Sequence, residues 1–318
     1  MNIDNVIKSA IEHHRAGNLQ QAKLLYKKIL KKQPTNSEAL HMLGVIYSVQ
    51  GNYDSAIYYI SRAIEFDQNN GYAYYNLGNA FRNKGQLDKA IINFQIAIQL
   101  NPAFVDAYYN LGIAFQDDRK FKKAIECYQK TLKLNPNLFN VFFNLGNAFK
   151  ENEQFDEATD CYRNALRLNP SFTPAYINFA SALIENDKFD EAIASCQKAL
   201  TLSPSSTEAH VTYLNLGIAL QGQGKHDEAI LMYKKAILLN PNDFRARFAR
   251  CMLQLRIIYW EHSDIQLCRD HYFDELIKLQ DSVSFINLEN IKWIEDHPIS
   301  RCWGACCLHS RRDQSRYR

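Results

Sequence analysis

The chain has 318 residues, with 37 Lys and Arg against 34 Asp and Glu, and a formal net charge of +3. Hydrophobic residues make up 47% of it and charged residues 22%, as in folded soluble proteins. A charge this small excludes a strongly basic nucleic-acid binder, and no expected helix face carries a dense stripe of Lys and Arg. No apolar run approaches the roughly 18 residues of a membrane-spanning helix, so we expect no membrane insertion.

The cysteines and the first residues bear on the cellular compartment. Residues 1–10 have the pattern of an amphipathic helix and lack the charged and apolar regions of a secretory signal. The eight cysteines are scattered along a long chain. This combination predicts reduced thiols and a cytoplasmic location.

Small residues recur along the chain with a fixed period. One series consists of alanines that are 34 residues apart, with a single final gap of 37. Its members are Ala22, Ala56, Ala90, Ala124, Ala158, Ala192 and Ala229. A series of glycines and alanines and a series of prolines keep the same period. Several series in step over seven units indicate a tandem repeat.

Each unit is predicted to be a helix, a turn and a second helix. In the third unit, the apolar residues from Tyr74 to Phe81 keep helical spacing, and Gly85 marks a turn. A second apolar stripe runs over residues 87–98. Pro102 ends that second helix, because proline disfavours helical backbone at the residue before it.

The order of an aromatic residue, Leu-Gly, a second aromatic, Ala, a third aromatic, Ala and Pro resembles the tetratricopeptide-repeat (TPR) pattern. The resemblance implies an all-α fold, a right-handed superhelical solenoid of about seven repeats. Three extra residues near 206–208 would lengthen the turn before the last repeat. We expect the repeats at 3–36, 37–70, 71–104, 105–138, 139–172, 173–206 and 210–243.

The chain after the repeats is expected to be helical at first. Residues 244–260 form an amphipathic pattern suited to cap the last repeat, and Ser263 with Gln266 is a capping box for a helix over 264–280. Beyond Pro298 the composition turns to Arg, Cys and Ser, which predicts disorder. The expected organisation is seven repeats over 1–243, capping and additional helices over 244–297, and a disordered tail over 298–318.

An asparagine row is the main candidate for a binding site. It occupies one place in successive repeats and consists of Asn76, Asn110, Asn144, Asn178 and Asn215. A superhelix would stack these residues along its concave groove. A side-chain amide offers an acceptor and two donors, so it can hold the C=O and N–H groups of an extended peptide. The alternative is that each asparagine only satisfies polar groups of its own helix.

Further side chains lie beside this row. Asn79 and Asn147, one turn later, could add contacts to a peptide. Tyr75, Tyr109 and Phe143 precede three of the asparagines and could line the same groove, or they could pack between repeats.

A different mode of peptide binding is not expected. Some TPR proteins clamp chaperone tails by the terminal carboxylate, and that clamp needs Lys and Arg at defined places. Those places hold no cation in this chain; they hold His41, Val45, Tyr75, Asn79, Tyr109 and Ile113.

Catalytic and metal sites are not expected either. The spacing of Cys302, Cys306, Cys307 and His309 does not match a tetrahedral zinc motif. No Gly-rich phosphate loop or hydrolase motif occurs. The sequence predicts no catalytic residue, no metal and no cofactor.

The central repeats carry a narrower resemblance. Residues 101–112 resemble the TPR region of O-linked N-acetylglucosamine transferases of the SPINDLY type, and residues 248–276 resemble the linker helices after their repeats. In that family the groove recruits protein substrates, and a separate domain uses the UDP-sugar. No alternating strands and helices for such a domain are expected here. Two functions therefore stay open: a non-enzymatic scaffold that binds an extended peptide, and the substrate-recognition part of a truncated or split glycosyltransferase.

Overall fold

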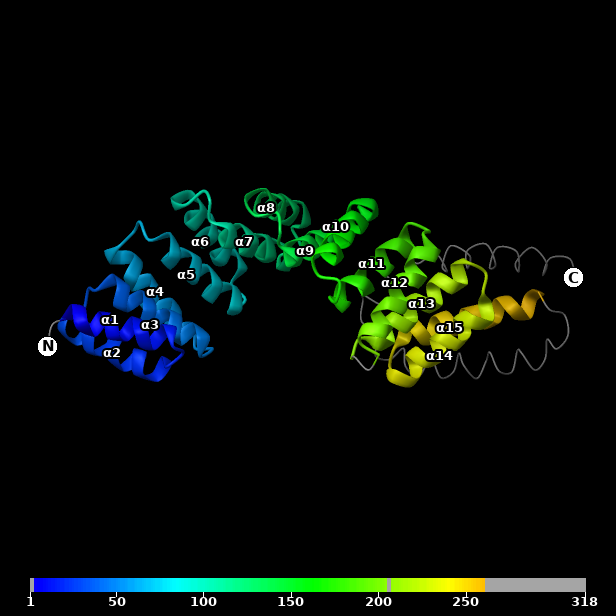
Figure 1. The fold of residues 1–318 in the computed structure, drawn as a ribbon, viewed down its shortest axis with the longest axis horizontal. Coiled ribbons are helices and arrows are strands. Elements are labelled where there is room, and N and C mark those ends of the chain that lie inside the picture. Colours follow the sequence, from blue (N-terminus) through cyan, green and yellow to red (C-terminus); the bar gives the residue numbers. More distant parts are fainter. Residues whose placement is uncertain (1–2, 205–206, 261–318) are drawn as a thin grey trace, which may run out of the picture. The chain divides into compact units, whose positions relative to one another are not determined.

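The computed structural model describes residues 3–204 and 207–260 (Figure 1). The described residues form fifteen α-helices and no β-strand, which confirms the all-α prediction. The helix expected over 264–280 and the tail expected over 298–318 lie outside the described residues.

The helices follow one another in seven antiparallel pairs, one for each predicted repeat, and a final single helix. Their bounds are α1 (Ile3–Arg15), α2 (Leu19–Lys32), α3 (Ser37–Val49), α4 (Tyr53–Phe66), α5 (Gly71–Asn83), α6 (Leu87–Leu100), α7 (Val105–Asp117), α8 (Phe121–Leu134), α9 (Phe139–Glu151), α10 (Phe155–Leu168), α11 (Thr173–Glu185), α12 (Phe189–Leu202), α13 (Ala209–Gly222), α14 (His226–Leu239) and α15 (Phe244–Trp260). The pairs confirm the predicted helix-turn-helix units.

Glycine makes the two helices of a pair approach closely. A Cβ atom added to Gly112 in α7 would lie 2.6 Å from Cε1 of Tyr128 in α8. The fully buried Tyr128 ring therefore occupies the space that any larger residue at 112 would need. Gly217 and Tyr233 repeat this contact in α13 and α14, where the corresponding distance is 2.4 Å. In these two pairs the periodic glycine of the first helix thus packs directly against the periodic aromatic residue of the second helix.

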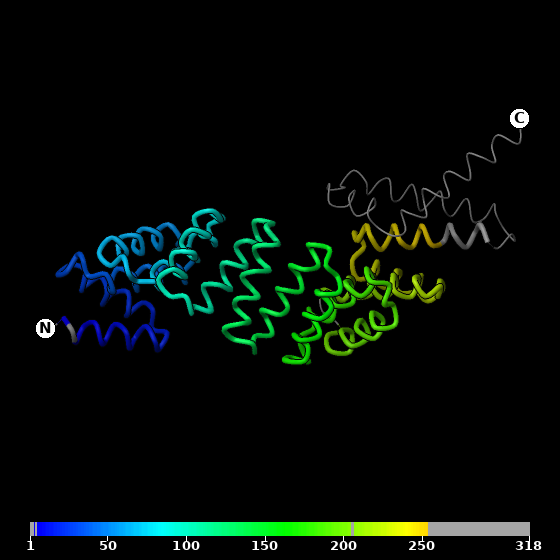
Figure 2. The backbone as a smooth tube through the Cα atoms, turned by 90° about the horizontal axis from the view of Figure 1, so that it is seen from above, coloured from blue at the N-terminus to red at the C-terminus, as the bar shows by residue number. Residues whose placement is uncertain are grey.

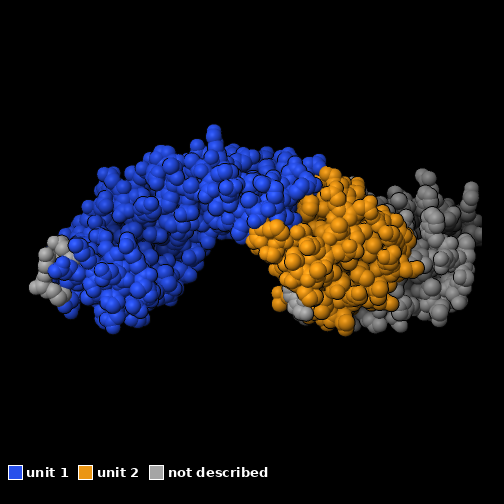
Figure 3. Space-filling view, viewed as in Figure 1, with its two compact units in different colours: residues 1–168 blue, residues 169–318 orange. Residues whose placement is uncertain are grey.

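The chain divides into two compact units, residues 1–168 and residues 169–318 (Figure 3). The first unit contains α1–α10, in which each helix packs against the next one (Figure 2). The described part of the second unit contains α11–α15, and α15 packs against α14 and α13.

The first helices of neighbouring repeats lie on the inner side of the first unit. In addition to the contacts within pairs, α3 contacts α5, α5 contacts α7, and α7 contacts α9. Figure 1 shows α5, α7 and α9 beneath α6, α8 and α10. A residue on α5, α7 or α9 that faces neither its paired helix nor a helix of a neighbouring repeat therefore points to this inner side.

Candidate functional site

The asparagine row runs along the inner helices of the first unit. Asn76 lies in α5, Asn110 in α7 and Asn144 in α9, and all three side chains are half-buried. They recur at the same place of successive helices that contact one another. The row predicted from the sequence is therefore present in this unit, on side chains that solvent reaches.

Each of these amides donates a hydrogen bond to a ring of the preceding repeat. Nδ2 of Asn110 lies 2.7 Å from the Tyr75 hydroxyl oxygen, and Nδ2 of Asn144 lies 2.9 Å from the Tyr109 hydroxyl oxygen. Donor and acceptor are 35 residues apart in both pairs, one more than the period. These bonds link one repeat to the next, so the asparagines have a structural role that the sequence reading left open.

The first member of the row has a histidine as its partner. Nδ2 of Asn76 lies 2.9 Å from Nε2 of His41 in α3. Burial lowers the pKa of His41 to about 4, against a smaller opposing effect of the Asp67 charge. The ring is therefore neutral near pH 7, and a neutral ring nitrogen can accept the amide hydrogen of Asn76.

The three predicted lining aromatics, in contrast, pack within their own repeats. Tyr75, Tyr109 and Phe143 are half-buried, and each ring leans against a buried ring of the paired helix. The ring-centroid distances are 6.0 Å for Tyr75–Phe94, 6.1 Å for Tyr109–Tyr128 and 6.1 Å for Phe143–Tyr162. These half-buried rings thus contribute to the core of their own repeats, and their role in lining a groove remains a prediction.

The two additional asparagines differ in their partners. Oδ1 of Asn147 accepts a hydrogen bond of 2.7 Å from the Tyr162 hydroxyl. At the equivalent place of the third repeat, Phe94 replaces this tyrosine and has no hydroxyl to offer. The half-buried Asn79 side chain has no hydrogen-bond partner within residues 3–204 and 207–260.

The second unit holds the last two members of the row. Asn178 lies half-buried in α11. Asn215 in α13 is only 8% exposed, and its Nδ2 lies 3.2 Å from the backbone oxygen of Ile177 in α11. Ile177 stands where the other repeats have Tyr75 or Tyr109, so a backbone carbonyl takes the place of the missing hydroxyl.

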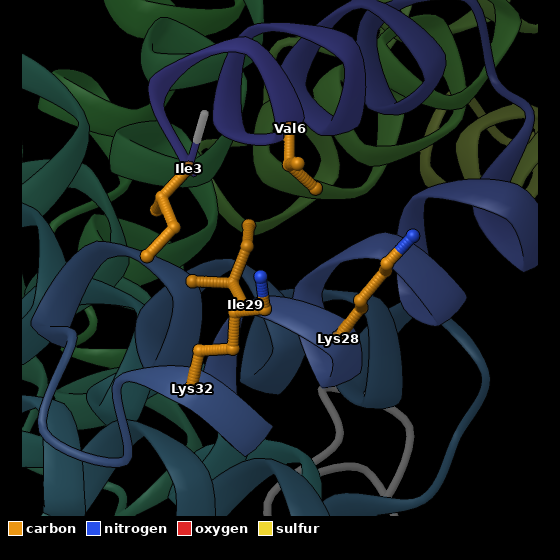
Figure 4. A pocket seen from close by; sticks show the side chains of 5 residues that line it. All are labelled: Ile3, Val6, Lys28, Ile29 and Lys32. Atoms are coloured by element: carbon orange, nitrogen blue, oxygen red, sulfur yellow. The ribbon is translucent and has the colours of Figure 1, made fainter. Parts of the chain in front are cut away.

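Other features of the described chain offer no site of comparable size. A shallow hollow at the start of the first repeat is lined by Ile3, Val6, Lys28, Ile29 and Lys32 (Figure 4). Its two lysines lie at the edge and the apolar side chains at its centre, an arrangement suited to no particular ligand.

The cysteines of the described part are packing residues. Cys127, Cys161, Cys196 and Cys251 are free thiols and buried. Burial raises the pKa of Cys127 to about 12, which removes the thiolate that metal binding and nucleophilic chemistry need. No group of three or more His, Cys, Asp or Glu residues in the described chain could hold a metal ion. The C-terminal Cys and His cluster lies outside the described residues.

The helices of the described chain also bear on membrane association. Within residues 3–204 and 207–260, none of them combines the length and the apolar character required to span a bilayer.

Comparisons with known proteins match the repeats. Models described as tetratricopeptide or TPR repeats match residues 25–58, 59–92, 78–118, 105–138, 139–172 and 173–238, which together run without a break from residue 25 to residue 238. No curated protein sequence matches the chain.

Solved structures share the fold at low identity. YrrB, described as a TPR protein with an unusual peptide-binding site, is 24% identical over 60% of this chain and 97% of its own, with a TM-score of 0.54. The C-terminal part of a TPR repeat-containing protein from Cytophaga hutchinsonii is 19% identical over 76% of this chain and 98% of its own, with a TM-score of 0.64. PilF of Pseudomonas aeruginosa is 21% identical over 65% of this chain and 94% of its own, with a TM-score of 0.57.

Proposed function

Because the chain belongs to the tetratricopeptide-repeat family, whose members generally mediate protein–protein interactions, we propose that it binds an extended segment of a partner protein along the inner helices of its repeats. The asparagine row Asn76, Asn110 and Asn144 forms the polar centre of this surface in the first unit. The proposal makes the protein a scaffold and not an enzyme.

The observation that carries the proposal is the unused hydrogen-bonding capacity of the row. A side-chain amide has two N–H donors and one carbonyl acceptor. Asn110 and Asn144 each use one donor on a tyrosine of the preceding repeat. Their Oδ1 atoms and second N–H groups have no partner within the described residues. One acceptor and one donor are what is needed to pair with the N–H and C=O of one peptide unit.

The bonds to the preceding repeat also favour binding. They fix the amide orientation before a ligand arrives, so less side-chain entropy is lost when the peptide binds. Hydrogen bonds between these amides and the peptide backbone select an extended peptide and place few demands on its side chains. YrrB has a peptide-binding site on the same fold, but at 24% identity the likeness extends to the fold alone. The proposal therefore rests on the amides.

Removing the amides tests the proposal. Peptides that bind the protein are selected from a phage-displayed random library and then measured by fluorescence polarisation. Each lost hydrogen bond costs about 0.5–1.5 kcal/mol, so replacing Asn76, Asn110 and Asn144 with Ala should cost about 3 kcal/mol or more, over a hundredfold in affinity. Asn93→Ala is the matched control, because Asn93 lies in α6 and its amide donates to the Lys89 carbonyl.

A second variant separates binding from structure. Replacing Tyr75 and Tyr109 with Phe removes the hydroxyls that orient Asn110 and Asn144 but leaves the amides in place. It should lower stability slightly and affinity by less than tenfold. Unchanged affinity in the asparagine variant would refute the proposal. Equal losses of stability and affinity in both variants would assign the row a purely structural role.

The glycosyltransferase-related function stays the alternative. The family comparisons lend it no support, and it rests on the resemblance of residues 101–112 and 248–276. A cytoplasmic location also remains a proposal, supported by the free, buried thiols of the described chain. Binding of peptides that carry a Ser or Thr acceptor, in preference to matched Ala peptides, would favour the alternative over a general scaffold.

A further inference from the structure

One charged side chain on the inner surface of the first unit lacks a counterion. Arg82 lies near the end of α5, two turns after Asn76, and its side chain is half-buried. Its Nη1 atom is shielded from solvent and has no hydrogen-bond acceptor in the described chain. No carboxylate lies within 4.0 Å of its guanidinium in that part of the chain.

Arg82 differs in this respect from other cations of the first unit. Arg163 pairs with Asp160 at 2.8 Å, and Lys84 pairs with Asp54. Those pairs are largely exposed, so they need little compensation. A shielded guanidinium nitrogen without an acceptor is costly, so the charge of Arg82 is poorly compensated within the described residues.

The surroundings of Arg82 belong to the proposed peptide surface. Burial raises the pKa of the Tyr109 and Tyr128 hydroxyls, and the positive charge of Arg82 opposes this effect at both groups. Tyr109 is also the partner of Asn144 in the asparagine row. The negative charge of Asp117 acts on the pKa of the Tyr128 hydroxyl in the opposite sense.

A second unpartnered group stands on the same face of α5. Asn79 precedes Arg82 by three residues, and side chains three apart on a helix are neighbours. Its amide has no partner because Phe94 replaces the tyrosine that binds Asn147 in the fifth repeat. The third repeat thus offers an amide donor beside a guanidinium, and neither group is engaged by the described chain.

We propose that Arg82 and Asn79 bind the side-chain carboxylate of an internal Asp or Glu in the partner segment. The guanidinium is planar and presents paired N–H donors that match a carboxylate, and the Asn79 amide can donate to the same group. The Arg82 side chain is half-buried and keeps some exposed surface, so the carboxylate would pair with the guanidinium from the exposed side. This inference rests on the proposed function and adds a chemical class, an acidic extended peptide.

The test uses the full chain and the peptides selected from the random library, synthesised with amidated C-termini so that only side chains carry a carboxylate. We expect selected peptides to share an Asp or Glu at one position. Replacing that residue with Asn or Gln should weaken binding to the unmodified protein about tenfold, as expected for one charge-assisted hydrogen bond. The same replacement should have no effect on binding to the Arg82→Gln variant.

Arg163→Gln is the matched control, since it removes an equal charge from an exposed pair. It should keep the full preference for the acidic peptide. Arg82→Gln should also leave the melting temperature unchanged or raise it, because the guanidinium has no partner to lose.

The outcomes separate this inference from the proposed function. Peptides that bind through the asparagines with no acidic preference, or with the same preference in Arg82→Gln, would overturn the role of Arg82 alone. A preference that disappears when the peptide has a free C-terminus would also overturn it, because the terminal carboxylate would then be the ligand. Absence of any peptide binding would overturn both proposals.

Discussion

Asn110 in the first unit and Asn215 in the second occupy the same place in their repeats, but their surroundings differ. Asn110 is half-buried and donates to a tyrosine hydroxyl of the preceding repeat. Asn215 is 8% exposed and donates to the backbone carbonyl of Ile177. The residue at one repeat place therefore does not determine the role of the side chain. Its partner in the neighbouring repeat does.

The difference bears on where a peptide should bind. In the first unit the amides keep an accessible acceptor and donor, whereas the Asn215 amide is enclosed by its own fold. We therefore expect the asparagines of the first unit to contribute to peptide affinity and Asn215 to contribute to stability.

The largest expected effect is a loss of stability of the first unit at acidic pH. The row begins with Asn76, whose partner is His41, whereas the partner of Asn215 in the second unit is a backbone carbonyl. Burial lowers the pKa of His41 to about 4 from an ordinary 6.5, so the unfolded state takes up this proton more readily. Stability should be fully present above pH 6.5 and fall as the pH drops from 6.5 to 4, by on the order of 3 kcal/mol in total.

Hydrogen exchange of α3 and α5 against pH measures this loss. His41→Tyr is the matched variant, because tyrosine occupies the same place in the next two repeats and its hydroxyl can accept from the Asn76 amide. It should flatten the pH dependence between 6.5 and 4. The same pH dependence in both proteins would show that His41 is not the acid-sensitive group of this unit.

A second experiment asks whether the helix pairs of the two units pack alike. Gly112→Ala and Gly217→Ala would each place a Cβ within 2.6 Å of a buried tyrosine ring. Overpacking of this kind costs about 1–3 kcal/mol, and urea unfolding should detect it in either unit. Gly71→Ala is the control, because its nearest neighbour would be Leu100 Cβ at 3.5 Å, an ordinary contact. Stability unchanged by Gly217→Ala would contradict the shared packing.

The smallest effect separates the two asparagines directly. Asn215→Ala should lower stability by about 1–2 kcal/mol, because it removes a buried hydrogen bond. Asn110→Ala should lower it by less than about 1 kcal/mol, since its lost bond is partly exposed and alanine is the better helix former. Chemical unfolding of the two variants gives the comparison. A larger loss for Asn110→Ala would reverse the assignment of roles.

The sequence predicted the fold closely because its information is local. The apolar stripes, the turn signals and the 34-residue period define each helix pair without knowledge of its neighbours. The helix predicted over 244–260 is observed as Phe244–Trp260. The organisation of residues beyond 260 remains a prediction.

The site was predicted less completely because its partners lie in other repeats. Tyr75 and Asn76 are neighbours in the sequence, but the hydrogen bond joins Tyr75 to Asn110, 35 residues later. A comparison of polar residues that are 35 positions apart, one more than the period, would have identified this pair. The burial of Asn215 and its bond to the Ile177 carbonyl were not predictable from its place in the repeat, since both depend on how α13 packs against α11. Arg82 was not predicted as a site residue, because a single arginine on a helix is usually solvated.

The side-chain amide resonances of the asparagines test the central claim most directly. A selected peptide is titrated into the protein, and the Nδ2 signals of Asn76, Asn110 and Asn144 are followed, each assigned from its own substitution. Our account predicts that the Asn110 and Asn144 signals shift and that their hydrogens exchange more slowly when the peptide is bound, while the Asn93 signal stays unchanged. If the peptide binds with the affinity found by fluorescence polarisation but the Asn110 and Asn144 signals do not shift, the account is contradicted.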